Sequence, residues 1–494
     1  MNLTTFTTRE PTYWPTDVNK LPDLLDFFIS KNIAKNNIEI KSNLDLSSDH
    51  TPVILFINTK PYTFSQDNHY LYNSKTNWRL FRECLDKSID INIALKDSKD
   101  IDNSTTNLIN LIQNAIKLAT PKITLSEKHF ILSTNIKKII AMKRRQRRIW
   151  QNTHFPEDKK KLNKISKDLK NLLEQHKNNS INNFVTNLTA NKDTNYSIWK
   201  VIKKNKTPFQ YIPPILNENN LWAKSNIEKV EAFANHFETV FKPFEIISNN
   251  NTDQEILKNL DAPFQLSKPI KPFKTKEILE IIKLNTHGKK APGMDLVNGT
   301  IIKNLSEKSL VLIKIIFNAI LRIFHFPKCW KTAQIILIPK PGKKPELTSS
   351  YRPISLLPIL SKIFEKLLLK RLKPILADQN LIPNHQFGFR NNHSTIEQVH
   401  RIVKTINQSF EEKKYCSAIF LDIMQAFDKV WHTGLLYKLK SILPYTYYQI
   451  FKSYILNRSF VIKFKDAISN IKPIYSGVPQ GSVLGPILYM LYTY

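Results

Sequence analysis

The pattern of apolar and polar residues changes in character along the chain, at about residue 266. Before that point, the run TPVILFI (51–57) is typical of a short strand, and residues 1–60 as a whole predict strands and loops. Leucine and isoleucine residues between 162 and 172 recur at spacings of three and four, which predicts one face of a helix. Residues 136–265 are basic, and we expect them to be mainly helical.

From about residue 266 onward, short strand patterns alternate with helical ones, which indicates an α/β or α+β domain. The segment 334–368 predicts a strand, a turn at KPGKK, a second strand at YRPISLL and then an amphipathic helix. The run LVLIKIIFNAILRIF (310–324) is interrupted by polar residues at helical spacing, so it predicts a packing helix. No apolar stretch reaches 18 residues, so we expect no membrane span and no membrane partner.

Residues Ala418–Leu421 have the pattern of a buried strand, and a helix-like pattern follows them through Ala426, Val430 and Leu435. Asp422 would then lie where a strand ends, which is a frequent place for a catalytic group. The competing interpretation is that its side chain caps the following helix.

The glycines are confined to one part of the chain. All nine lie between Gly288 and Gly485, and the first 287 residues contain none. Glycine is the usual residue where a backbone turns tightly or closely approaches a ligand. We therefore expect the C-terminal part to differ in kind from what precedes it.

The charge of the chain indicates a polyanionic partner. Its 494 residues carry a net charge of +32. An anionic membrane surface is the competing interpretation. The run KKIIAMKRRQRRIW (137–150) packs seven basic residues into fourteen, which fits a solvated helix face or a helix that follows nucleic acid. Three widely spaced cysteines form no zinc pattern or disulfide framework, which favours a reducing compartment.

Six stretches of the C-terminal part carry candidate chemistry. They are, in order, GKKAPGMD (288–295), IILIPKPGKK, YRPISLL, QFGFR, FLDIMQAFDKV and SGVPQGSVLGP. Each alone has a structural interpretation, as a surface charge, a helix cap or a glycine-rich turn. Together and in this order, they resemble the reverse transcriptase domain of non-LTR (LINE-type) retrotransposons of the jockey-like kind.

The resemblance implies an α+β fold, with the fingers and palm of a right-hand polymerase over residues 266–494. It makes Asp422 the catalytic carboxylate and a metal ligand, with help from the carbonyl of Ile423. The metal implied is Mg²⁺ or Mn²⁺, because nucleotide transfer uses two hard cations held by oxygen ligands.

The same resemblance assigns nucleotide-binding roles. Lys340 and Arg352 would hold the triphosphate, and Arg390 would add to them. Phe427 would lie below the sugar and exclude a 2′-hydroxyl. The nucleotide-binding set implied is therefore Lys340, Arg352, Arg390, Phe427, Gln480 and Gly481. We expect Asp428 to serve structure rather than metal binding.

A second resemblance lies near the start of the chain. PTYWPTDVNKLPDLLDFFIS (11–30) and LSSDHTPVILF (46–56) look like the end of the endonuclease domain of these elements, an endonuclease/exonuclease/phosphatase α/β sandwich. His50 matches the catalytic histidine there, with Asp49 beside it. We therefore predict an endonuclease fragment over 1–60, a basic and mainly helical linker region over 61–265, and a truncated reverse transcriptase domain over 266–494.

The sequence departs from the family at one motif. The remaining metal carboxylates would come from a Tyr-x-Asp-Asp turn, and no Asp-Asp pair occurs in this sequence. We therefore expect the domain to be truncated before that motif and the chain to be inactive alone, both as a polymerase and as a nuclease.

These patterns predict an RNA-directed DNA polymerase of a non-LTR retrotransposon. The partners implied are template RNA, target or primer DNA and deoxynucleotides, and the places implied are the nucleus and cytoplasm. The oligomeric state is left open. Two alternatives remain: a non-catalytic nucleic-acid-binding remnant of such an element, and a maturase-like relative, against which SDHTPV upstream argues.

Overall fold

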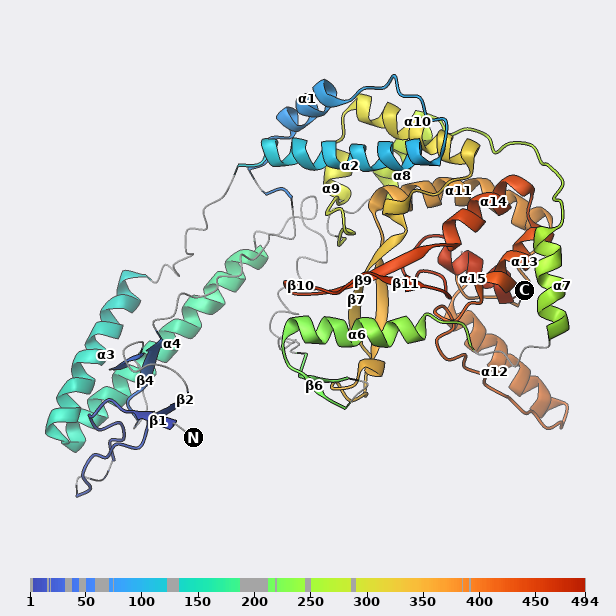
Figure 1. The fold of residues 1–494 in the computed structure, drawn as a ribbon. Helices are drawn as coiled ribbons and strands as arrows, with labels where there is room; N and C mark the ends of the chain where they lie inside the picture. Colours follow the sequence, from blue (N-terminus) through green and yellow to red (C-terminus); the bar gives the residue numbers. More distant parts are fainter. Residues whose placement is uncertain are drawn as a thin grey trace. The chain divides into compact units, whose positions relative to one another are not determined.

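The structure is a computed structural model, and it describes residues 3–15, 17, 19–31, 38–43, 50–57, 71–73, 75–121, 133–186, 212–217, 220–244, 250–285, 290–383, 385–390 and 392–493. The chain forms two compact units (Figure 1). Unit 1 comprises residues 1–64 and 124–210, and unit 2 comprises residues 65–123 and 211–494. The segment 61–265 is therefore divided between the two units.

Unit 1 combines two small antiparallel sheets with two long helices. Strands β1 (Leu3–Phe6) and β2 (Phe28–Lys31) pair with each other, as do β3 (Ile38–Ser42) and β4 (Val53–Ile57). The helices are α3 (Thr134–Thr153) and α4 (Pro156–Thr186). The predicted strand at 51–57 and the predicted helix across 162–172 are thus confirmed.

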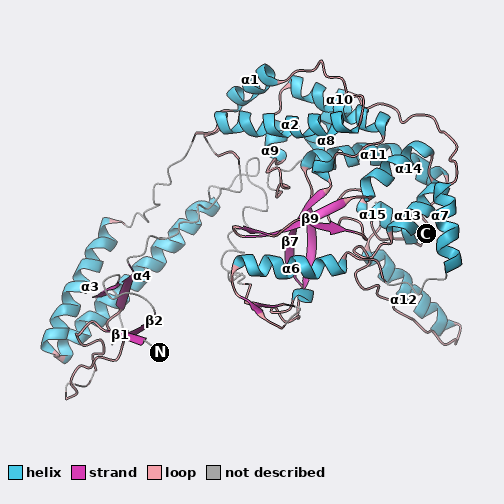
Figure 2. Cartoon of the chain, viewed as in Figure 1, coloured by secondary structure: helices cyan, strands magenta, loops and turns pink. Residues whose placement is uncertain are grey.

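The sheet of unit 2 is built around the predicted hairpin. Strand β7 (Thr332–Pro339) pairs antiparallel with β8 (Tyr351–Leu356) and parallel with β9 (Arg458–Phe464). The short strands β10 (Ala467–Ile468) and β11 (Lys472–Ile474) both pair with β9. Helix α6 (Asn226–Val240) packs against these strands and lies across them in Figure 2. The prediction of a strand, turn and strand at 334–356 is confirmed.

The remaining elements of unit 2 are mostly helices, which enclose a separate apolar core around Phe317, Phe364 and Trp330. Strands β5 (Ile215–Leu216) and β6 (Trp222–Ala223) form a small antiparallel pair. The predicted packing helix at 310–324 is confirmed as α10 (Glu307–Ile323). These elements are β5 (Ile215–Leu216), β6 (Trp222–Ala223), α1 (Trp78–Ser88), α2 (Ser98–Ala119), α7 (Asn250–Asp261), α8 (Thr275–Asn285), α9 (Gly299–Lys303), α10 (Glu307–Ile323), α11 (Ile359–Asp378), α12 (Thr395–Glu411), α13 (His432–Ile442), α14 (Tyr445–Ile455), α15 (Gly485–Thr493) and the 3₁₀ turns Lys328–Trp330 and Thr348–Ser350.

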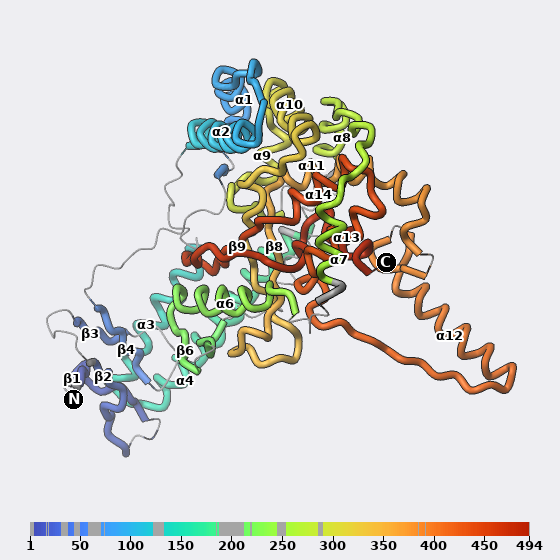
Figure 3. Tube along the Cα trace, turned by 45° about the vertical axis from the view of Figure 1, so that its right-hand side comes forward, coloured from blue at the N-terminus to red at the C-terminus, as the bar shows by residue number. Residues whose placement is uncertain are grey.

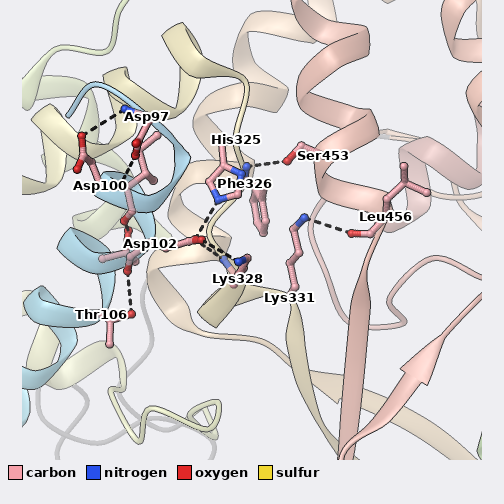
Figure 4. Close-up of polar contacts among 12 residues, drawn as sticks. Asp97, Asp100, Asp102, Thr106, His325, Phe326, Lys328, Lys331, Ser453 and Leu456 are labelled. Atoms are coloured by element: carbon pink, nitrogen blue, oxygen red, sulfur yellow. Dashed lines mark hydrogen bonds and ion pairs between the residues drawn. The ribbon is translucent and has the colours of Figure 1, made fainter. Parts of the chain in front are cut away.

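One carboxylate links helix α2, whose apolar face is buried, to the turn after α10 in the same unit (Figure 4). Oδ1 of Asp102 accepts a hydrogen bond from the backbone N–H of Lys328 at 2.8 Å and lies 3.0 Å from Nε2 of His325. The helix itself begins with a capping box, in which the side chains of Asp97 and Asp100 each accept from the other's backbone N–H. A helix expected in a linker is therefore part of the core of unit 2.

Replacing Asp102 by alanine should destabilise unit 2 by about 1.5–3 kcal/mol, because it removes an ionised acceptor from two donors. The measurement is the midpoint of urea unfolding. Asp86→Ala, at an exposed position of α1, is the matched control and should change stability by less than about 0.5 kcal/mol. Equal midpoints for the two variants would contradict the anchoring role of Asp102.

The strand expected at Ala418–Leu421 does not form, so this prediction is wrong. Residues 414–423 have no regular secondary structure, and the side chains of Ile419, Phe420 and Leu421 are 81–90 % exposed. The helix that follows begins only at His432, after turns at 424–429. Apolar residues favour a strand only where a neighbouring strand pairs with them, and none of the described residues pairs with this segment.

The helix before this segment is also uncovered. Helix α12 extends away from the rest of unit 2 (Figure 3), and none of its residues is buried. Ile396, Val399 and Phe410 on it are between 58 and 70 % exposed. None of the helices in the described part of the chain is both long and apolar enough to cross a bilayer.

Candidate active site

The β7–β8 hairpin positions the first two site residues. In its register Ile338 lies opposite Arg352, and Lys340 follows directly after β7. The backbone N–H of Lys340 donates to the carbonyl of Ser350 at 2.8 Å, and its ammonium group donates to the carbonyl of Ser349 at 2.8 Å. The two cationic side chains are thereby held at the same end of the hairpin.

A cavity of about 170 Å³ opens beside this end, and we call it the hairpin cavity. Lys340, Arg352, Phe427 and Gln480 all line it. These residues come from separate segments of the sequence, and the fold brings four of the six predicted nucleotide-binding residues together. Its other lining residues include Tyr351, Asp428 and His236.

Phe427 is held between two aromatic rings. Its ring stacks on Tyr489 with centroids 4.7 Å apart and meets the edge of Phe389 at 5.5 Å. Its backbone carbonyl accepts a hydrogen bond from the N–H of Val478 at 2.8 Å. The glycine-rich segment before α15 therefore fixes the position of Phe427.

The predicted residues outside the hairpin cavity lie in three places. Gly481 lines a neighbouring pocket, with φ at +113°. Arg390 lines a third cavity and donates to the carbonyl of Pro383 at 3.2 Å. Asp422 and Ile423 lie in the exposed segment before the turns and do not line the hairpin cavity.

The resemblance implies a metal ion at Asp422, which can be compared with the donors around it. A two-ion site takes several oxygen ligands. In the described part of the chain, no group of three or more His, Cys, Asp or Glu side chains could hold a metal ion. Asp422 could therefore supply only part of the donor set of a two-metal centre.

Asp428 has an environment that its sequence context did not indicate. Burial raises the pKa of its carboxyl group from 3.8 to about 6, while the positive charges of Lys340 and Lys429 act in the opposite direction. Its backbone carbonyl accepts from the hydroxyl of Ser476 at 2.9 Å. A carboxyl group with a raised pKa thus lines the hairpin cavity together with Lys340.

This raised pKa predicts a pH dependence of stability. Between pH 4 and 6 the folded protein holds a proton on Asp428 that the unfolded chain has lost, so stability falls as pH rises through this range and stays lower above it. As pH rises from 4 to 6, the melting temperature of Asp428→Asn should fall less steeply than that of the wild-type protein. Asp86→Asn, an exposed control, should keep the wild-type profile. The same profile in both variants would contradict the assignment.

Two further residues were missed by sequence reasoning. His236 belongs to α6, in the region expected to be a linker, and it reaches the hairpin cavity because α6 packs on the sheet. Glu365 on α11 is fully buried, and its carboxylate accepts hydrogen bonds from the N–H groups of Val483 and Leu484 at 2.8 and 3.2 Å. Glu365 therefore holds the loop that carries Gln480 and Gly481.

A buried arginine lies near Glu365. Burial raises the pKa of Glu365, and the positive charge of Arg458 partly offsets this. Nη1 of Arg458 donates to the carbonyl of Tyr454 at 3.1 Å. The hydroxyl of Ser361, one turn before Glu365 on α11, donates to its carboxylate at 2.9 Å. The loop is thus anchored to a buried carboxylate that Ser361 also contacts.

Unit 1 contains a separate pair at His50. Its Nδ1 lies 2.8 Å from Oδ2 of Asp26, and the hydrogen bond to His50 lowers the pKa of Asp26. The ring of Tyr13 lies 5.0 Å from that of His50. Asp26 was not singled out from the sequence, although it stands two residues before β2. Asp49 lies outside the described residues.

Comparison with known proteins identifies the C-terminal part of the chain. Residues 338–494 match the family "Reverse transcriptase (RNA-dependent DNA polymerase)". This match contains β8, the last two residues of β7, the segment with Phe427 and the glycine-rich loop.

Similarity to individual proteins extends over nearly the whole chain. It is 38% identical over 490 residues to "Probable RNA-directed DNA polymerase from transposon BS" of Drosophila melanogaster, covering 98% of this chain and 54% of that protein. It is 36% identical over 490 residues to "RNA-directed DNA polymerase from mobile element jockey" of the same species, covering 98% and 53%. The chain thus spans about half the length of the curated relatives it matches. Residues 338–494 therefore carry a reverse transcriptase domain, and over nearly its whole length the chain is similar to the RNA-directed DNA polymerases of jockey-like and other Drosophila non-LTR retrotransposons.

Proposed function

We propose that this chain acts in the copying of RNA into DNA, and that the hairpin cavity holds the incoming deoxynucleotide. In this reaction the 3′-hydroxyl oxygen of a DNA primer attacks the α-phosphorus of the nucleotide, and diphosphate leaves. The observation that carries the proposal is the convergence of Lys340, Arg352, Phe427 and Gln480 on one cavity.

The chemistry of the cavity supports a role for each side chain. The ammonium group of Lys340 and the forked guanidinium of Arg352 suit a triphosphate. The ring of Phe427, held by Tyr489 and Phe389, offers a flat surface below the sugar. Gln480 would lie along the nucleotide, and Gly481 would allow close approach of the backbone. Arg390 would act from the neighbouring cavity.

Asp422 is the proposed catalytic carboxylate, and Asp422 with the carbonyl of Ile423 would contribute ligands to Mg²⁺ or Mn²⁺. The reverse transcriptase family generally depends on a divalent metal, which supports a cation of this class.

For the remainder of the chain we propose the division expected from the sequence. Residues 1–60 would be the end of an endonuclease/exonuclease/phosphatase fold, in which Asp26 orients the ring of His50. Residues 61–265 would be a basic region between this fragment and the fingers and palm at 266–494, with α1, α2 and α6 packed within unit 2. The partners would be template RNA, nicked target DNA and deoxynucleotides, and the reaction would take place inside the cell.

Binding of a deoxynucleotide triphosphate to the full chain tests the proposal without requiring turnover. The double variant Lys340→Gln/Arg352→Gln should weaken binding by tenfold or more, because each charge-assisted contact contributes about 1.5–3 kcal/mol. The measurement is titration with a fluorescent dTTP analogue. Lys87→Gln/Lys99→Gln, at exposed positions of α1 and α2, is the matched control. Equal affinity in the two double variants would exclude the hairpin cavity as the nucleotide site.

A further inference from the structure

A second pocket in unit 2 is lined by three lysines. Lys362 and Lys366 are one turn apart on α11, and Lys290 belongs to the loop before α9. The pocket has a volume of about 160 Å³, several times the roughly 30 Å³ that a water molecule occupies in the liquid. We call it the lysine pocket. Its remaining lining is mainly apolar and includes Gly481 and Val483.

The lysine pocket has positive side chains in its lining and no negative ones among the described residues. The ammonium groups of Lys290, Lys362 and Lys366 make no ion pair or hydrogen bond with any residue that the structure describes. Burial lowers the pKa of both Lys362 and Lys366, and the charge of Lys290 lowers both further, while the negative charge of Glu365 acts in the opposite direction on Lys362. Three cations that repel one another around one opening favour an anion as the ligand.

The lysine pocket adjoins the hairpin cavity through a single loop. Gln480 lines the hairpin cavity and Gly481, the next residue, lines the lysine pocket. The loop is held in place by the N–H of Ser355, which donates to the carbonyl of Gln480 at 2.8 Å. A Cβ atom at Gly481 would lie 2.8 Å from the carbonyl oxygen of Ser355, so only glycine fits there. Ligands in the two places would thus be separated by the thickness of one backbone.

We propose that the lysine pocket binds a backbone phosphate of a single-stranded nucleic acid, and that this contact places the strand beside the loop that faces the incoming nucleotide. The inference rests on the proposed function, because it takes RNA as the polyanion. Three ammonium groups on flexible stems suit the non-bridging oxygens of a phosphodiester without reading the base. The contact would therefore fix the position of the strand and tolerate any sequence.

Protection of lysines from acetylation, read by mass spectrometry, tests this in the wild-type full chain. The probe is a short single-stranded RNA of mixed sequence. On addition of RNA, the reactivity of Lys290, Lys362 and Lys366 should fall several-fold. Lys87, Lys99 and Lys117, exposed on α1 and α2, should keep their reactivity. This local readout separates the lysine pocket from the basic helices of unit 1, which we also expect to bind RNA.

The triple variant Lys290→Gln/Lys362→Gln/Lys366→Gln provides a second measurement. Loss of one phosphate contact should make the slope of log affinity against log salt shallower by about 0.7, the contribution of one phosphate in a single strand. The variant Lys87→Gln/Lys99→Gln/Lys117→Gln removes the same charge and should leave the slope unchanged. If the pocket variant does not fold, the acetylation result on the wild-type chain still shows whether the lysine pocket binds RNA.

Each other outcome has a distinct meaning. RNA that binds and protects unit 1 but not the three pocket lysines overturns the inference and leaves the proposed function standing. Inorganic phosphate that protects the three lysines as well as RNA does, at the same phosphate concentration, overturns the assignment to a strand. Absence of any RNA binding by the wild-type chain overturns both the proposed function and this inference.

Discussion

Replacing Gly477 by alanine is expected to destabilise unit 2 by about 2–5 kcal/mol. Gly477 has φ at +93°, a region that costs an L-residue about 1–2 kcal/mol. A Cβ atom there would lie 2.7 Å from the carbonyl oxygen of Asp428, and overpacking of this kind costs about 1–3 kcal/mol more. The N–H of Gly477 also donates to the carbonyl of Val430 at 2.8 Å, so displacement would weaken that bond.

The chain offers a matched control for this substitution. Gly342, in the turn between β7 and β8, has φ at +72° but no atom within 4 Å of an added Cβ. Gly342→Ala should therefore carry only the conformational cost of about 1–2 kcal/mol. Urea unfolding of both variants measures the difference. If Gly477→Ala costs no more than Gly342→Ala, the close packing of residues 427–430 against 476–478 is wrong.

Glu365→Ala should destabilise unit 2 by about 3–5 kcal/mol, because it leaves the buried charge of Arg458 without its nearby carboxylate. It also removes the acceptor of the Val483 and Leu484 N–H groups. Glu365→Gln keeps an acceptor and should cost less. Glu280→Ala is the control, since its pair with Lys370 is 3.9 Å long and exposed, and such pairs contribute about 0–1 kcal/mol.

A double variant separates the charge from the anchoring of the loop. Removing two buried opposite charges together often costs less stability than removing one of them alone. Glu365→Leu/Arg458→Met should therefore recover much of the stability lost in Glu365→Ala, while deoxynucleotide binding stays weak because the loop with Gln480 has lost its anchor. Full recovery of nucleotide binding in the double variant would contradict the positioning role of Glu365.

The parts of the fold that depend on local pattern could be predicted from the sequence. The hairpin of β7 and β8 follows from two strand-like runs around KPGKK, and α10 follows from polar residues at helical spacing. The failed strand at Ala418–Leu421 illustrates the limit. An apolar run can predict the tendency to form a strand, but the strand forms only where a partner pairs with it.

The sequence predicted which residues belong to the candidate site. It did not predict how they are arranged in space. Lys340, Arg352, Phe427 and Gln480 stand in motifs, and their meeting in one cavity depends on packing between distant segments. Glu365 looked like an ordinary polar position in KIFEKLL, because nothing local indicates that its side chain is buried beneath a loop more than 100 residues later. His236 was missed for the same reason, since α6 joins the sheet only in three dimensions.

The placement of α2 has a consequence for how the protein folds during synthesis. Asp102 meets His325 across a separation of 223 residues, and the segment 124–210 between them belongs to the other unit. The apolar face of α2 therefore leaves the ribosome long before the residues that cover it. Contacts between residues so far apart in the sequence are slow to form, and until they form the apolar surface of α2 is exposed and prone to aggregation. We expect nascent chains that stop short of residue 325 to be bound by chaperones.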